Sequence, residues 1–175
     1  MPTTRRFALF FAVSAGLLWL SPWALAALFD NEFDEKPWEE IEVQLPAFPE
    51  AENLIPFQVG AISDMRFLID EKSISVGSDA VIRYTLVAIS PQGARNVSFE
   101  GMRCDTVERR VYAFGQADGT WSKARSNKWA RIRGSSNSYP VALFADYFCT
   151  IGQRTVMTPE DAVRVLRYGG RGAEP

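Results

Sequence analysis

The sequence of 175 residues contains no histidine. Histidine is the commonest general acid or base near neutral pH and the commonest metal ligand in proteins. Its absence excludes Ser-His-Asp and Cys-His catalysis, together with every zinc site that uses an imidazole ligand. The composition is otherwise that of an ordinary globular protein, with 47% hydrophobic and 23% charged residues.

The chain also lacks the short motifs of several enzyme classes. It contains no P-loop, no dinucleotide-binding glycine fingerprint, no G-x-S-x-G elbow and no S-x-x-K nucleophile. An acidic run that begins at Asp30 resembles the start of a calcium loop, but Glu35 stands where such a loop needs glycine and Ile41 where it needs glutamate. We therefore predict no metal site and no cofactor.

One catalytic chemistry remains open to a chain without histidine. A pair of carboxylates about 5 to 10 Å apart can cleave a glycosidic bond. Glu39 or Glu40 beside Trp38, together with Asp146 in an aromatic stretch, are the candidates for such a pair. No feature of the sequence singles them out, since most carboxylates are solvated. A small hydrolase of envelope polysaccharide is thus the alternative hypothesis, and no catalytic residue is assigned.

Residues 1–26 have the pattern of a secretory signal peptide. Arg5 and Arg6 precede an apolar run from Phe7 to Leu20, and the small residues Ala24 and Ala26 follow it. The run is shorter than the roughly 20 residues of a membrane-spanning helix. We predict cleavage after Ala26, with an uncleaved anchor as the alternative. The mature protein is then exported, periplasmic or secreted, with no transmembrane span.

Both cysteines, Cys104 and Cys149, lie in the part of the chain that remains after this cleavage. An even number of cysteines in an oxidising compartment predicts one structural disulfide. A redox-active pair would instead need close spacing such as C-x-x-C, whereas these two lie far apart in the sequence.

Charge is distributed unevenly along the predicted mature chain. Residues 27 to 54 contain nine acids and a single lysine, whereas bases outnumber acids from Ile55 onward. Four prolines between positions 37 and 56 predict an extended arm in place of helices. We expect this acidic arm to lie near a basic face of its own domain. The functional alternative is that either patch docks a partner of opposite charge.

Apolar residues that alternate with polar ones predict about seven strands after the arm. The expected fold class is α+β and predominantly antiparallel β, as a sandwich or a partly open barrel, with one or two C-terminal helices. The predicted organisation is a signal peptide over 1–26, an acidic proline-rich arm over 27–56, one globular domain over 57–170 and a flexible tail over 171–175.

Four local strand patterns are specific enough to compare with a structure. Alternation over 41–45 predicts a short edge strand inside the arm. The segments 65–69 and 73–76 predict a hairpin, and 80–90 is apolar on both faces, as in a central strand. In the strand 95–104, Gly101 predicts a bulge that turns Cys104 toward the same face as Val97 and Phe99.

The C-terminal third contains the predicted helices. Apolar pairs four residues apart over 139–148 favour a helix, although a segment of that length also permits a strand. The next helix is predicted to begin after Thr158 as N-cap, with Pro159 in its first position, and to end at Gly169 and Gly170.

Basic residues concentrate between Arg103 and Arg133, interleaved with Tyr112 and two tryptophans. In a cytosolic protein this pattern would indicate nucleic acid, but export makes an acidic protein, a lipid headgroup or an anionic envelope polymer the expected partner. The competing interpretation is a solvated strand face screened by the acidic arm. The candidate interaction surface comprises Trp38, Glu39, Glu40, Arg109, Arg110, Trp121, Lys123, Arg125, Lys128, Trp129 and Arg131.

Several segments also carry a family resemblance. They are KPWEE at 36–40, QLPAFP at 44–49, GSDAVIRYTLVAISPQGARNVSFEGMRC at 77–104 and DYFC at 146–149. Over about residues 36 to 168 the chain resembles the CNP-one-like family of small exported proteobacterial proteins. The resemblance implies one domain in the bacterial envelope and assigns no catalytic or binding residue. We therefore predict non-catalytic interaction in the periplasm.

Overall fold

The computed structural model describes residues 37–61 and 63–173. The predicted signal peptide, its cleavage site after Ala26 and the acidic run that begins at Asp30 lie outside the described residues. From Trp38 onward the chain forms one compact unit.

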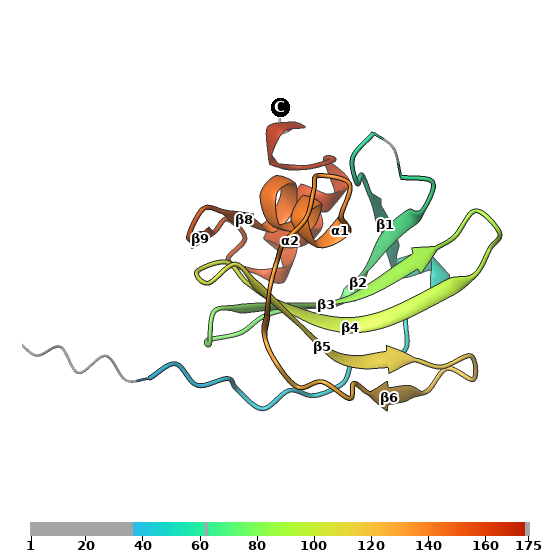
Figure 1. Ribbon diagram of the computed structural model, residues 1–175, viewed down its shortest axis with the longest axis horizontal. Helices are drawn as coiled ribbons and strands as arrows, with labels where there is room; N and C mark the ends of the chain where they lie inside the picture. The colour runs from blue at the N-terminus through green and yellow to red at the C-terminus, as the bar shows by residue number, and fades with distance from the viewer. Residues whose placement is uncertain (1–36, 62, 174–175) are drawn as a thin grey trace, which may run out of the picture. The chain divides into compact units, whose positions relative to one another are not determined.

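The centre of this unit is an open antiparallel sheet in which each strand pairs with the next one along the chain, and the sheet is not closed into a barrel (Figure 1). A 3-10 turn, η3 (Ala51–Asn53), directly precedes it. The strands are β1 (Leu54–Phe57), β2 (Arg66–Val76), β3 (Val81–Ile89), β4 (Arg95–Arg103), β5 (Glu108–Gly115) and β6 (Trp121–Lys123), and β7 (Ala130–Arg131) also pairs with β5.

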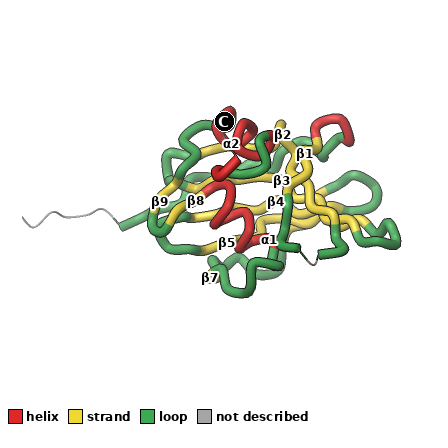
Figure 2. The backbone as a smooth tube through the Cα atoms, turned by 90° about the horizontal axis from the view of Figure 1, so that it is seen from above, coloured by secondary structure: helices red, strands yellow, loops and turns green. Residues whose placement is uncertain are grey.

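Helices cover one face of the sheet, as Figure 2 shows from above. The helix α1 (Tyr139–Ala142) runs directly into a π-helical segment, η4 (Leu143–Phe148). The small hairpin of β8 (Cys149–Thr150) and β9 (Gln153–Arg154) leads to α2 (Pro159–Arg167) and a last 3-10 turn, η5 (Arg171–Ala173).

The start and end of α2 follow the predicted signals. The Thr158 side chain accepts a hydrogen bond from the backbone N–H of Asp161, and the Asp161 carboxylate accepts one from the backbone N–H of Thr158. This capping box satisfies two N–H groups that have no partner within the helix. Gly169 and Gly170 follow with φ of 83° and 116°, values that glycine adopts without strain.

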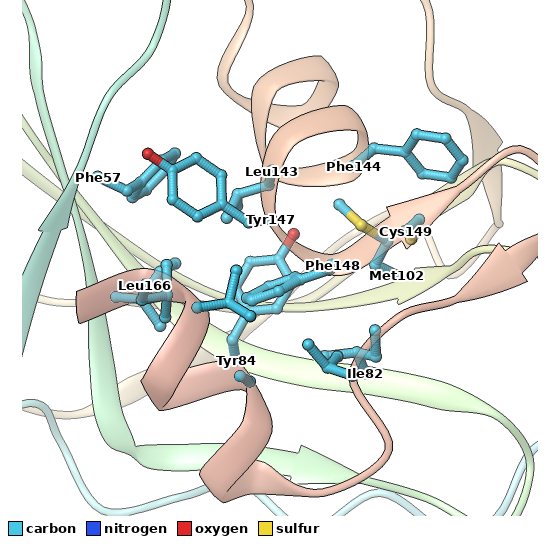
Figure 3. Packing of buried hydrophobic residues seen from close by; sticks show 14 of the residues in the cluster. Phe57, Ile82, Tyr84, Met102, Leu143, Phe144, Tyr147, Phe148, Cys149 and Leu166 are labelled. Atoms are coloured by element: carbon cyan, nitrogen blue, oxygen red, sulfur yellow. The ribbon is translucent and has the colours of Figure 1, made fainter. Parts of the chain in front are cut away.

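The main core lies between the sheet and the helices. Tyr84 from β3 meets Phe148 with ring centroids 5.7 Å apart, and Phe57 from β1 meets Tyr147 at 5.6 Å. Figure 3 shows these rings around Leu166 of α2 and beside Met102 and Cys149. The hydroxyl oxygen of Tyr147 also accepts a hydrogen bond from the backbone N–H of Gln58 at 2.9 Å. Aromatic pairs in such edge and tilted arrangements add to the free energy gained by burial.

The predicted disulfide is present. Cys104, directly after β4, and Cys149, the first residue of β8, are joined with a Cα–Cα distance of 5.5 Å. Both cysteines are buried. The bridge links the sheet to the helical layer that covers it.

The predicted fold class is confirmed, because the protein is mostly antiparallel β with two C-terminal helices. The central position of 80–90 and the helical character of 139–148 are confirmed as well. Helices, and not a second large sheet, cover the face that a sandwich would fill with strands, and the open sheet excludes the barrel form.

Three local predictions are wrong. Residues 41–45 form no strand, and the backbone N–H of Ile41 binds the side chain of Asp79 in place of a neighbouring strand. Residues 65–76 do not form a hairpin, since β2 is one strand with an irregularity between Asp70 and Ser75. Gly101 is not a bulge: β3 and β4 pair without interruption, and the extra residue is Tyr112 in β5. No rephasing is needed because both faces of β4 are buried.

Candidate functional site

The arm, residues 38–50, runs in extended form along the side of the sheet opposite the helices (Figure 1). Glu40 is its main polar anchor. Its carboxylate accepts hydrogen bonds from the Tyr112 hydroxyl at 2.5 Å, from Arg83 at 3.3 Å and from the Trp129 indole at 3.3 Å, and it also contacts Arg110. Charge-assisted bonds of this kind are stronger than neutral ones.

Asp79, between β2 and β3, is the second anchor. It forms a 2.6 Å ion pair with Arg83 and accepts the backbone N–H of Ile41 at 3.1 Å, while its own carbonyl accepts the Trp38 indole N–H at 2.8 Å. Burial alone would raise the pKa of Asp79, but the bonds from Arg83 and from backbone N–H groups together hold that pKa below its usual value. The Arg103 guanidinium stacks 3.8 Å from the Trp38 ring centroid.

The rest of the arm is held by aromatic contacts. The Trp121 indole donates to the carbonyl of Pro46 at 3.0 Å, and the rings of Trp121 and Phe48 lie 5.4 Å apart. Gly115 makes this possible, because a Cβ there would stand 2.8 Å from the Phe48 ring. Gly101 similarly leaves room for the ring of Tyr112, with a hypothetical Cβ only 2.4 Å from its hydroxyl.

The described part of the arm therefore lies against a basic and aromatic face of its own domain, as the charge distribution predicted. The structure divides the candidate interaction surface into two groups. One group holds the arm in place; it comprises Trp38, Glu40, Arg110, Trp121 and Trp129. The exposed residue Glu39 lies within the arm, and Arg131 is exposed in β7.

The second group lines a concavity on the helix-facing side of β5, which we call the basic groove. Its volume is about 440 Å³. It contains four bases, Arg109, Lys123, Arg125 and Lys128, together with the half-exposed ring of Phe114. Lys123, at the edge of the sheet, also lines a concavity next to Val43 and Leu45 of the arm. No aspartate or glutamate of the described chain is among the residues that line it. The remaining lining residues are Val111, Gln116, Ser122, Ala124, Ser126 and Ala130.

A second concavity of about 350 Å³, which we call the Glu100 pocket, adjoins the groove and shares Arg109, Val111 and Phe114 with it. Glu100 of β4 lies at the base of this pocket and is 1% exposed. Its carboxylate accepts bonds from Ser98 at 2.7 Å and Tyr139 at 3.0 Å, and from Arg109 at 3.2 Å to each oxygen. It also accepts the hydroxyl of Tyr84 at 3.3 Å.

Electrostatics in the Glu100 pocket keep its tyrosines protonated. Burial, with the Glu100 charge next in importance, raises the pKa of Tyr84 and of Tyr139 well above the usual value. Each hydroxyl therefore remains a donor to the carboxylate. Sequence reasoning missed this cluster, because Glu100 follows an apolar strand pattern and its partners come from β3, β4, β5 and α1.

The residues of the hydrolase hypothesis are not brought together. Glu40 lies on the arm side of the sheet, whereas Asp146 is exposed in η4 on the helical side. The sheet separates them, so they do not flank a common bond. Glu40 is moreover surrounded by four donors that hold the arm.

A larger depression of about 790 Å³ lies between β2 and α2. Its lining residues carry both signs, with three bases (Lys72, Arg164 and Arg167) and two acids (Glu71 and Glu160), and Arg167 binds Glu71 at 2.5 Å. Its excess of positive charge is therefore smaller than that of the basic groove. We therefore regard the basic groove as the better candidate site although its volume is smaller.

Residues 37–61 and 63–173 contain neither a cluster of metal ligands nor a helix that could span a membrane. Within these ranges no group of three or more histidine, cysteine, aspartate or glutamate residues is placed to hold a metal ion. No helix in the described part of the chain is both long and apolar enough to cross a membrane.

The fold and the site together define a small disulfide-linked α+β protein with an intramolecular arm on one face of its sheet and a basic concavity on the other. The chain belongs to the CNP1-like family, whose model matches residues 33–167. Comparison with curated proteins and with solved structures gave no match.

Proposed function

We propose that the protein is a non-catalytic binding protein of the periplasm that takes an anionic partner in the basic groove. The observation that supports this most strongly is the charge of the groove: four bases and no lining carboxylate. The arm carboxylate of Glu40 is engaged by Arg83 and Arg110, which are not groove residues. A concave surface of one sign raises the local concentration of ligands of the other sign.

Export agrees with the N-terminal sequence pattern and with the buried Cys104–Cys149 bridge, because disulfides persist in oxidising compartments. An acidic protein segment and an anionic envelope polymer are both partners of the right charge. The groove contains exposed lysines and arginines that a partner can reach without disturbing the core.

The double substitution Lys123→Glu/Lys128→Glu should abolish binding of a fluorescent polyanion such as labelled dextran sulfate to the purified exported protein. Both side chains are exposed, so the melting temperature should stay within a few degrees of the parent value. Fluorescence anisotropy at low and high salt is the measurement, because surface charge attraction weakens as salt rises.

The matched control is Arg66→Glu/Lys72→Glu. These two bases are equally exposed, lie on β2 and give the same change in net charge. It should weaken binding far less than the groove variant. Equal loss with both pairs would mean that net charge alone attracts the polyanion, and the groove would lose its assigned role.

A further inference from the structure

The basic groove and the Glu100 pocket are adjacent concavities, and Arg109 lines both of them. Phe114 and Val111 form the apolar boundary common to both concavities. Phe114, the second-last residue of β5, is 48% exposed. An exposed aromatic ring between a charged groove and a polar pocket indicates a ligand with both an apolar surface and polar groups.

The Glu100 pocket differs from the groove in its electrostatics. Arg109 and Glu100 form an ion pair at its base, so their charges compensate each other. The contacts of Arg109 with Glu100 and Tyr139 run through Nη1, and its side chain is 28% exposed. Other groups at the rim include the exposed amide of Asn96. This arrangement offers uncharged donors and acceptors together with two cations, Arg109, which the groove shares, and the exposed Arg95.

The ion pair at the base leaves Glu100 no free charge to attract a cation, and a carboxylate placed directly against Glu100 would meet a like charge at short range. Hydroxyl groups meet no such repulsion, and they both donate and accept hydrogen bonds. A sugar ring combines such hydroxyls with an apolar C–H face that can lie on the Phe114 ring. We propose that the groove and the Glu100 pocket together bind an anionic polysaccharide, with one sugar ring against Phe114 and its acidic groups along the lysines and arginines of the groove.

This proposal rests on the proposed function, and it selects a polysaccharide over an acidic protein segment. The test compares two probes of equal charge and similar length, polygalacturonate and poly-L-glutamate, by isothermal titration calorimetry with the full exported protein. We expect polygalacturonate to bind more tightly. Phe114→Ala should weaken its binding about five- to tenfold and leave the affinity for poly-L-glutamate unchanged, while Phe114→Tyr should restore the preference.

The outcomes separate the two proposals. Equal affinities for both polymers, unaffected by Phe114→Ala, would overturn the polysaccharide assignment and leave the anion-binding groove intact. A preference for poly-L-glutamate would overturn it in favour of an acidic protein segment. Failure of both polymers to bind would overturn the proposed function as well. Because Phe114 is half exposed, thermal unfolding should show that all three proteins are folded.

Discussion

Asp79→Ala should lower the free energy of unfolding by about 3 kcal/mol, the lower end of the usual cost of removing one partner of a buried ion pair, because Arg83 keeps its longer contact with Glu40 at 3.3 Å. The side chains of Asp79 and Arg83 are 1% and 4% exposed. Removal of Asp79 also takes away the acceptor for the Ile41 N–H, so the arm should loosen. Urea unfolding at pH 7 measures the first effect, and limited proteolysis of the arm measures the second.

Asp105→Ala is the matched control. Asp105 also pairs with an arginine, Arg103 at 3.0 Å, but its side chain is 53% exposed. Exposed pairs contribute about 1 kcal/mol or less, so this variant should be nearly as stable as the parent and keep its arm protected. Similar losses in both variants would contradict the assignment of Asp79 as a buried anchor.

Asp79 should also contribute to the pH dependence of the free energy of unfolding. The folded-state pKa of Asp79 is lowered, and its unfolded value is about 3.9, so its contribution is complete above the unfolded pKa and lost as pH falls through the folded pKa. Asp79→Asn should therefore flatten the acid limb of the stability curve. The exposed residues Asp118 and Asp161 also have lowered pKa values, but they act equally in both proteins and cancel in the comparison.

The parts of the fold that sequence reasoning predicted correctly are those set by local chemistry. The two apolar faces of β3 indicate a strand covered on both sides, and Thr158, Pro159 and the two glycines mark the ends of α2 by hydrogen bonding and backbone geometry alone. The acidic arm and the basic domain likewise differ enough in charge to predict their contact.

The errors arise where tertiary contacts override local pattern. The alternation of Ile41, Val43 and Leu45 is real, but the backbone N–H of Ile41 binds the side chain of Asp79 and no neighbouring strand. Gly101 is present to admit the Tyr112 ring, a requirement set by a residue on the adjacent strand. A single sequence does not contain the register that brings the two together.

For the candidate site too, some residues were predicted from the sequence alone and others depend on tertiary contacts. Its lysines and arginines were found from composition, because positive charge is visible in any sequence. The distinction between Arg110, which binds the arm, and its neighbour Arg109, which reaches Glu100, depends on the two faces of β5. Successive strand residues point to opposite faces, but which face the arm occupies is decided by the packing of the whole chain.

Replacement of both cysteines, Cys104→Ala/Cys149→Ala, should lower the free energy of unfolding by about 4 kcal/mol, from the loop-closure entropy that a bridge over this separation removes from the unfolded chain. The bridge encloses 45 positions and joins the end of β4 to the helical layer. Chemical unfolding under oxidising conditions measures the loss. Small cavities left by the two sulfur atoms add to it, since both sites are buried.

Single substitutions separate these two causes. Either Cys104→Ala or Cys149→Ala alone breaks the bridge, so each single variant should lose nearly as much stability as the double variant. Independent packing effects would instead add, each single variant losing about half. The parent protein treated with a strong reductant in urea should match the single variants, because it lacks the bridge and keeps the sulfur atoms. A reduced parent as stable as the oxidised one would show that packing, and not the bridge, holds the helical layer on the sheet.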